Sequence, residues 1–195
     1  MAKFVPDIQT NRWVIIAPAR VTRPHDNIAH PASVCPFCPG QEGLNKTVFS
    51  VGDIRVIANK YPITDFHEVI IHSPDHTKDV DKMSPEQIEL LFTVYRRRYN
   101  SYKEQGSVMI FNNHDIHAGS SLSHPHSQLV VVPKQINLDT IAKEPVQNEV
   151  KRTKYFVAYC PDFSQWPYEV WVAPLIESKT FGEITDEQIA DLAPL

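Results

Sequence analysis

An internal repeat is the feature that most constrains how this chain can fold. The segment His67–Ile71 (HEVII) resembles Tyr168–Val172 (YEVWV), at an offset of 101 residues. The segment Ser84–Leu90 (SPEQIEL) resembles Thr185–Asp191 (TDEQIAD) at the same offset, and a third pair, near residues 56 and 156, agrees within one residue. The chain is therefore predicted to contain a unit of β-strands and a helix twice.

The second copy ends much earlier than the first. It stops at Leu195, early in its helix, whereas in the first copy two further predicted strands follow the corresponding helix. We expect residues 1–134 to form the first repeat, and residues 135–195 to form a linker, from about 135 to 152, and a partial second repeat. On this interpretation the chain is a C-terminally truncated form of a longer protein; the alternative is a second unit that is naturally short.

Local patterns predict the individual elements. Ser84 is a suitable N-cap, Pro85 suits the first helical position, and Gln87 completes a capping box, so a helix is expected over 84–102. Apolar and aromatic residues at helical spacing predict one buried stripe, made of Ile88, Leu91, Phe92, Tyr95, Tyr99 and Tyr102. Alternating and β-branched residues predict strands at 11–18, 55–58, 68–72, 107–112 and 128–132. A tight knuckle is expected at 35–40, and a loop at 20–33.

Charge and hydropathy exclude several classes of function. The 195 residues carry 19 Lys and Arg against 23 Asp and Glu, a formal net charge of −4. This balance argues against nucleic-acid and anionic-membrane partners, because there is no basic excess to neutralise phosphates. The apolar runs are too short to cross a bilayer, and the N-terminal MAKFVP lacks the apolar core of a signal peptide. A cytoplasmic protein is predicted.

Cys35 and Cys38 have the spacing of a metal knuckle. Two thiolates on one tight turn suit Zn²⁺, although the same Cys-x-x-Cys spacing also occurs in redox sites. The surrounding sequence has no thioredoxin-like pattern, which favours metal. Two further ligands are needed, and His76 and His124 are the best candidates, but spacing alone does not select them.

The sharpest motif is Ser123–Gln128 (SHPHSQ), which leads into an apolar strand. Because alternate strand residues share a face, His124, His126 and Gln128 are expected to project together. Upstream, Ala118–Ser121 (AGSS) is a small-residue loop whose N–H groups and hydroxyls could hold phosphate oxygens.

This combination suggests attack on phosphorus by a neutral imidazole. A phosphorus–nitrogen bond is labile, so a nucleotidyl-histidine can pass its group to a second acceptor, and Gln128 could donate to the oxygens that gather charge. The alternative is that both histidines bind metal or are structural. The remaining histidines are expected to be structural or surface residues: His25, His30, His67, His72, His114 and His117.

Several segments together resemble the galactose-1-phosphate uridylyltransferase family of the histidine-triad superfamily. They are Asn11–Arg20, Cys35–Cys38, Asn59–Pro62, Ser73–His76, Gly119–Gln128 and, in the partial second repeat, Trp166–Trp171. The resemblance implies an α+β fold with a histidine-triad-like antiparallel sheet and helix, duplicated, with the second copy incomplete. It also implies a two-step exchange, in which a histidine takes a nucleoside monophosphate from a nucleotide sugar and passes it to a sugar 1-phosphate or phosphate.

The resemblance assigns a role to each matched position. His126 would be the nucleophile, Gln128 would steady the transferred phosphoryl group, and Arg20 and Ser121 would lie near the phosphates. Asn59, Tyr61 and Asn113 would contact the nucleotide, with a packed aromatic as the alternative for Tyr61. One structural Zn²⁺ would be bound by Cys35, Cys38, His76 and His124.

Three departures from the family pattern matter for specificity. Ser127 stands where the family usually has glycine, a form that resembles ADP-glucose phosphorylases and leaves the choice between uracil and adenine open. The linker lacks clear ligands for the family's second metal site, and none is assigned. The family's sugar contacts come largely from the missing C-terminal part and from the partner subunit of a homodimer.

The leading interpretation is a UDP-glucose:hexose-1-phosphate uridylyltransferase of galactose metabolism. Phosphorolysis of ADP-glucose or of a dinucleoside polyphosphate is the alternative enzyme. A zinc-stabilised nucleotide-binding protein without catalysis is the alternative from another class.

Overall fold

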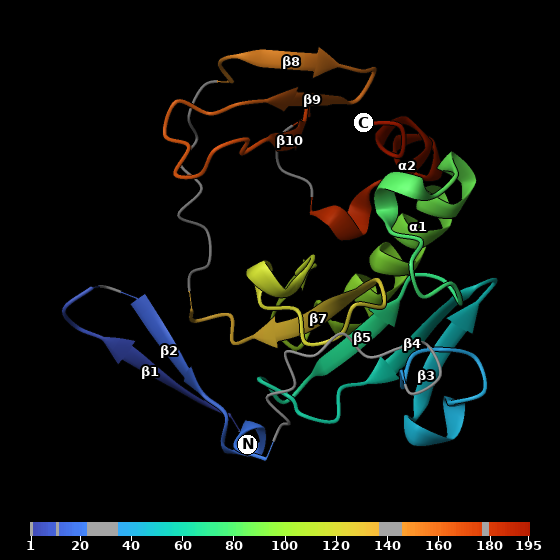
Figure 1. Ribbon diagram of the computed structural model, residues 1–195. Coiled ribbons are helices and arrows are strands. Elements are labelled where there is room, and N and C mark those ends of the chain that lie inside the picture. The colour runs from blue at the N-terminus through green and yellow to red at the C-terminus, as the bar shows by residue number, and fades with distance from the viewer. Residues whose placement is uncertain (1, 11, 23–34, 137–145, 177–179) are drawn as a thin grey trace. The chain divides into compact units, whose positions relative to one another are not determined.

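The computed structural model describes residues 2–10, 12–22, 35–136, 146–176 and 180–195 (Figure 1). Two compact units are present. The first comprises Met1–Met83 with Ser101–Ile136, and the second comprises Ser84–Asn100 with Asn137–Leu195. Most of the loop predicted at 20–33, part of the linker predicted at 135–152, and His25 and His30 lie outside the described residues.

The first unit is built on a five-stranded antiparallel sheet with the strand order β3-β4-β5-β7-β6. Its strands are β3 (Thr47–Val51), β4 (Ile54–Ala58), β5 (His67–Ile71), β6 (Ser107–Phe111) and β7 (His126–Val132). The four strands predicted from the sequence in this region are thus confirmed within one or two residues. β3 was not predicted, and its mostly exposed residues explain why no strong pattern marks it.

The centre of this sheet is the core of the first unit. All five residues of β5 are buried, as are six of the seven residues of β7. Their Val and Ile side chains suit a strand covered on both faces. The carboxylate of Glu68, which is 2% exposed, accepts a hydrogen bond of 2.8 Å from the hydroxyl of Tyr102, so a polar group is satisfied within this core.

A separate antiparallel hairpin precedes the sheet, formed by β1 (Lys3–Asp7) and β2 (Arg12–Ile16). The strand predicted at 11–18 is therefore confirmed over its central part. Every residue of β2 is exposed, including Trp13 at 43%.

The helix predicted at 84–102 is confirmed as α1 (Pro85–Tyr102). Its residues 85–100 belong to the second unit, and its last two residues belong to the first. The Ser84 hydroxyl accepts a hydrogen bond of 3.3 Å from the backbone N–H of Gln87, as expected of an N-cap. The buried stripe differs from the prediction. Only Leu91 and Val94 are buried, and the aromatic residues of the predicted stripe keep intermediate exposure.

The second unit also contains an antiparallel sheet, of strand order β10-β9-β8, followed by a short helix. Its elements are β8 (Glu149–Arg152), β9 (Phe156–Tyr159), β10 (Trp171–Pro174) and α2 (Asp186–Leu192). α1 and α2 begin at Pro85 and Asp186, at the offset of the sequence repeat, and Thr185 and Gln188 form a complete capping box on α2. Both sheets therefore contain three consecutive antiparallel strands followed by a helix.

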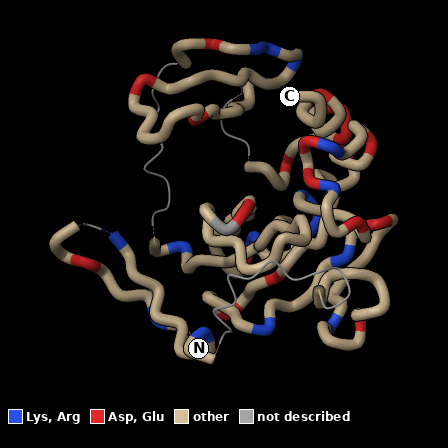
Figure 2. Tube along the Cα trace, in the orientation of Figure 1, with Lys and Arg blue, Asp and Glu red and all other residues tan. Residues whose placement is uncertain are grey.

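Charges are mixed along the chain. Figure 2 shows acidic and basic positions interspersed along the trace, in keeping with the small net charge. Among the described residues, no helix is long and apolar enough to cross a membrane.

Gly106 offers a test of the packing beside β6. A Cβ at this position would meet the carbonyl oxygen of Val132 and would lie 2.8 Å from Cγ1 of Val131, so backbone would have to move. We expect Gly106→Ala to destabilise the protein by about 1–3 kcal/mol, measured as a lower midpoint of thermal unfolding. Gly43→Ala is the matched control, because no atom lies within 4 Å of its added Cβ; equal midpoints for the two variants would contradict this packing.

Candidate active site

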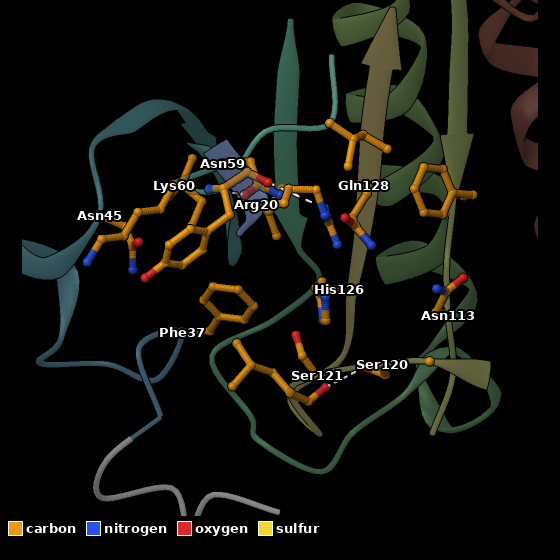
Figure 3. A pocket seen from close by; sticks show the side chains of 17 residues that line it. Arg20, Phe37, Asn45, Asn59, Lys60, Asn113, Ser120, Ser121, His126 and Gln128 are labelled. Carbon is orange, nitrogen blue, oxygen red and sulfur yellow. Dashed lines mark hydrogen bonds between the residues drawn. The ribbon is translucent and has the colours of Figure 1, made fainter. Parts of the chain in front are cut away.

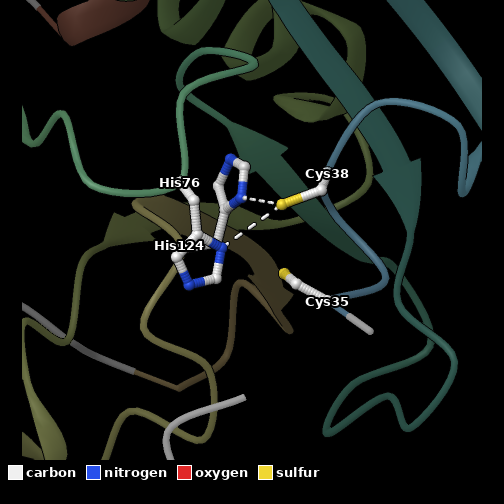
Figure 4. A group of neighbouring side chains, drawn as sticks. All are labelled: Cys35, Cys38, His76 and His124. Atoms are coloured by element: carbon white, nitrogen blue, oxygen red, sulfur yellow. Dashed lines mark hydrogen bonds between the residues drawn. The ribbon is translucent and has the colours of Figure 1, made fainter. Parts of the chain in front are cut away.

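Four side chains converge beside the N-terminal end of β7 (Figure 4). The ligand atoms of Cys35, Cys38, His76 and His124 all lie within 4.8 Å of one another. Cys38 Sγ lies 3.3 Å from His76 Nδ1 and 3.5 Å from His124 Nδ1. A tetrahedral zinc ion places sulfur and nitrogen ligands roughly 3.3–3.8 Å apart. The two distances to Cys38 fit that spacing, and the four residues together could hold a metal ion. The structure thus brings together the four residues that the resemblance indicated.

We call Cys35, Cys38, His76 and His124 the metal group. Both of its histidines present Nδ1 to Cys38. Nε2 of His124 donates to the carbonyl oxygen of Ser73 at 2.9 Å, and Nε2 of His76 lies 3.1 Å from the hydroxyl of Ser123. Such outer contacts fix the tautomer of a ligating histidine and leave its other nitrogen for the metal. Burial lowers the pKa of His124, which favours the neutral ring that metal binding requires.

The cysteine knuckle is held by its own turn and by one arginine. The N–H of Cys38 donates to the carbonyl of Cys35 at 3.2 Å, and Nη2 of Arg55 donates to the carbonyl of Phe37 at 3.0 Å. Burial, and secondly the neighbouring Cys35, raise the pKa of the Cys38 thiol to about 11. A bound cation would offset this cost, because it stabilises the thiolate directly.

A cavity of about 320 Å³ opens on the side of the sheet that carries His126 and Gln128 (Figure 3). Its described lining includes two cations, Arg20 and Lys60, and no carboxylate. Apolar walls come from strands β4 and β5 and from the knuckle residue Phe37. A concave site with cationic groups and an apolar wall suits an anionic ligand that also carries an apolar ring.

His126 stands at the first position of β7 and is 9% exposed. Its Nδ1 donates to the carbonyl oxygen of His124 at 2.8 Å. A carbonyl can only accept, so Nδ1 carries the proton and Nε2 keeps its lone pair. The ring of Phe37 meets the imidazole edge-on, with centroids 5.1 Å apart. The imidazole of His126 is therefore held in one orientation at the cavity wall.

Gln128 is oriented by a second histidine. The N–H of Ile63 donates to Nδ1 of His67 at 3.0 Å. Nε2 of His67 lies 2.9 Å from Nδ2 of Asn59 and 3.1 Å from Oε1 of Gln128, so it contacts both side-chain amides. The contact with His67 holds the oxygen end of the Gln128 amide. Sequence reasoning treated His67 as structural, because its contact with Gln128 depends on the pairing of β5 with β7, which no motif reveals.

The remaining predicted contacts surround the same cavity. Asn59 accepts a hydrogen bond of 2.8 Å from the N–H of Tyr61 through its side-chain oxygen, and Arg20 donates to the carbonyl of Tyr61 at 3.4 Å. Asn113 and Ser121 lie on the opposite side, in the loop that precedes β7.

The loop before β7 contains two residues with positive φ. Gly119 has a φ of +82°, and Asp115 has a φ of +66° and accepts from the N–H of Ser120 at 3.1 Å. The Ser120 hydroxyl donates to the carbonyl of Leu122 at 2.7 Å, whereas Ser121 lines the cavity. The backbone N–H and the hydroxyl of Ser120 are thus hydrogen-bonded within the loop itself.

One orientation differs from the sequence prediction. His124, His126 and Gln128 were expected on one face, but β7 begins only at His126, and the residues before it do not follow the alternation of a strand. His124 turns to the metal group, and only the other two line the cavity. Phe37 and Lys60 also line it and were not predicted; for Lys60 the available signal was its place inside the matched Asn59–Pro62 segment.

Comparisons with known proteins agree with this architecture. The family described as "Domain of unknown function (DUF4931) N-terminal domain" matches residues 19–135, which is more than half of the chain. ADP-glucose phosphorylase from Arabidopsis thaliana is 28% identical, over 97% of this chain and 70% of its own length. Galactose-1-phosphate uridylyltransferase from Thermotoga maritima is 24% identical, over 94% of this chain and 70% of its own length.

A solved structure shows the same fold. The crystal structure of the Arabidopsis thaliana ADP-glucose phosphorylase with bound ADP-glucose has a TM-score of 0.75 and 26% identity, and it covers 99% of this chain and 74% of its own chain. These findings confirm the resemblance to the galactose-1-phosphate uridylyltransferase family and the α+β class with antiparallel sheets. The chain spans about 70% of the length of the relatives that it matches.

The raised pKa of Cys38 predicts pH-dependent metal binding. Because the thiol must lose its proton, the apparent affinity for Co²⁺ should rise with pH throughout the range below about 11, by roughly tenfold per pH unit for each proton released. Titration of the thiolate–Co²⁺ charge-transfer absorption measures this. Cys38→Ser should weaken that absorption and Cys160→Ser should leave it intact, since Cys160 lies outside the metal group; an affinity independent of pH would contradict the assignment.

Proposed function

We propose that this chain, which belongs to the DUF4931 N-terminal domain family, is a nucleotidyltransferase that acts through a covalent nucleotidyl-histidine on His126. The observation that carries the proposal is the hydrogen bond of 2.8 Å from Nδ1 of His126 to the carbonyl of His124. It assigns the ring proton to Nδ1, so Nε2 carries the lone pair, and the ring lines a cavity with two cations and no carboxylate in its described lining. Phosphorus is the electrophile that this combination suits.

In the first step, Nε2 of His126 attacks the α-phosphorus of a nucleotide sugar. A P–N bond forms while the bond from the α-phosphorus to the bridging oxygen breaks, so the sugar 1-phosphate leaves with that electron pair. A buried, neutral imidazole attacks well because it has no proton to lose first.

In the second step, an oxygen of an acceptor phosphate attacks the same phosphorus and the P–N bond breaks. The imidazole is regenerated with its proton still on Nδ1. Gln128, whose carbonyl oxygen is engaged by His67, donates an amide N–H to the non-bridging oxygens that gather charge in both steps.

Arg20 and Lys60 neutralise the phosphates during the exchange. Both line the cavity, and Arg20 is held against the carbonyl of Tyr61. Ser121 contributes a hydroxyl from the loop before β7, while Asn59, Tyr61 and Asn113 contact the nucleoside. Because Arg20 is oriented by the Tyr61 carbonyl before the substrate arrives, it stabilises developing charge with little reorganisation.

The metal in this proposal is one structural Zn²⁺, bound by Cys35, Cys38, His76 and His124. When bound, it supplies a rigid cross-link rather than a Lewis acid for the reaction. The chain's own contribution is to place His124 so that its carbonyl orients His126. The two-sulfur, two-nitrogen donor set is typical of closed structural zinc sites.

The proposed substrates are UDP-glucose and a hexose 1-phosphate, which would place the protein in galactose metabolism. The second candidate is phosphorolysis of ADP-glucose or of a dinucleoside polyphosphate, with phosphate as the acceptor. It is favoured by Ser127 and by the 28% identity to ADP-glucose phosphorylase. The proposal includes a homodimer, with residues 1–134 as the histidine-triad-like catalytic repeat and 135–195 as the linker and partial second repeat.

Intact-mass spectrometry after separate incubations with UDP-glucose and ADP-glucose tests the proposal. We expect a uridylyl or adenylyl adduct on the wild-type chain, none on His126→Ala, and unchanged metal content in that variant. His117→Ala is the matched control, because His117 is an exposed histidine outside the cavity lining, and it should retain the adduct. An adduct on His126→Ala would refute the assignment, and binding of nucleotide without any adduct would favour a non-catalytic binding protein.

A further inference from the structure

Two buried polar side chains meet on the face of the sheet opposite the cavity. His72 is 0% exposed and Ser127 is 1% exposed. Nε2 of His72 lies 2.8 Å from the hydroxyl oxygen of Ser127. Burial of polar groups costs free energy unless they are hydrogen-bonded, so an apolar pair would serve a sheet core as well or better. The pair therefore calls for an explanation beyond packing.

The contact closes one end of the β5–β7 strand pair. Ile70 pairs with Ser127, and Ile71, the last residue of β5, pairs with His126. The N–H of His72 continues the ladder by donating to the carbonyl of Pro125 at 3.2 Å. Since side chains alternate across a strand, Ser127 lies on the face opposite His126, and the His72–Ser127 contact crosses the pair diagonally.

This end of the pair needs support from side chains. Pro125 has no N–H, so it cannot return a hydrogen bond to β5, and a strand end with one backbone bond is prone to fray. The contact of His124 with the carbonyl of Ser73, at 2.9 Å, holds the chain before His126. The contact of His72 with Ser127 holds the chain after it. His126 is thus fixed from both sides.

We propose that His72 and Ser127 form a positioning clamp that holds the backbone of His126 and thereby aims its Nε2 into the cavity. The clamp rests on the proposed function of His126, and neither residue touches the substrate. Burial lowers the pKa of His72 to about 4, so its ring is neutral near pH 7 and can pair with a hydroxyl without a counter-charge. A nucleophile displaced by about 1 Å can lose as much as a hundredfold in rate, so a modest shift of one strand end is sufficient.

Single-turnover kinetics with the 195-residue chain tests the clamp. Ser127→Ala should slow adduct formation by about tenfold or more, with the Kd for the donor changed by no more than about twofold. Ser127→Thr, which keeps a hydroxyl, should recover most of the rate. His72→Leu should match Ser127→Ala, and the double variant should be no slower than either single one, because both remove the same bond.

A matched control separates positioning from stability. Thr153→Val also removes a side-chain hydrogen bond, from the Thr153 hydroxyl to Asp191 at 2.6 Å, but in the second unit. It should lower the thermal midpoint and leave the rate of adduct formation unchanged. If Ser127→Ala keeps the wild-type rate, or loses rate and donor affinity to the same extent, the clamp is refuted.

A second readout judges the clamp independently of catalysis. Imidazole ¹⁵N NMR of the zinc-loaded chain reports which nitrogen of His126 carries the proton. The clamp predicts one Nδ1–H form in the wild type and a mixture of tautomers in Ser127→Ala, since the bond to the His124 carbonyl would loosen. Identical spectra would refute the clamp. If no donor forms an adduct with the wild type, the proposed function fails, and the NMR comparison still decides for or against the clamp.

Discussion

The antiparallel pairing of β5 with β7 is the contact on which the rest of the site depends. Its register sets Ile71 opposite His126 and Val69 opposite Gln128. Residues about 50 to 60 positions apart in the sequence then meet along one seam, through three side-chain contacts: His67 with Gln128, His72 with Ser127, and Ser73 with His124. A shift of one residue would turn His126 and Gln128 to the opposite face and break all three contacts.

The position of the cysteine knuckle depends in turn on the pairing of β5 with β7. His124 and His76 lie next to its two strands, and they approach Cys38 to 3.5 and 3.3 Å. The knuckle therefore covers the end of the sheet and carries Phe37 to the ring of His126. The metal group and the proposed nucleophile are structurally linked, because the carbonyl of a predicted metal ligand, His124, orients the imidazole of His126.

Much of this could be predicted from the sequence. The repeat, four of the five strands of the first sheet and α1 follow from local patterns, and the SHPHSQ motif singled out His126 and Gln128, which line the cavity. The remainder depends on non-local geometry. Spacing could not select His76 as a ligand, since it meets the knuckle only after β5 and β7 pair. The turn of His124 away from the cavity, and the contact of His67 with Gln128, depend on where β7 begins and on its register, which no local pattern encodes.

Isotope exchange is the most direct test of the central claim, that His126 carries the nucleotidyl group. Labelled glucose 1-phosphate is incubated with the chain and unlabelled UDP-glucose or ADP-glucose, with no other acceptor present. A covalent intermediate predicts that label enters the nucleotide sugar, since the first step runs in both directions, and that His126→Ala abolishes this exchange. No exchange with either donor, while the chain binds the nucleotide, would contradict the account.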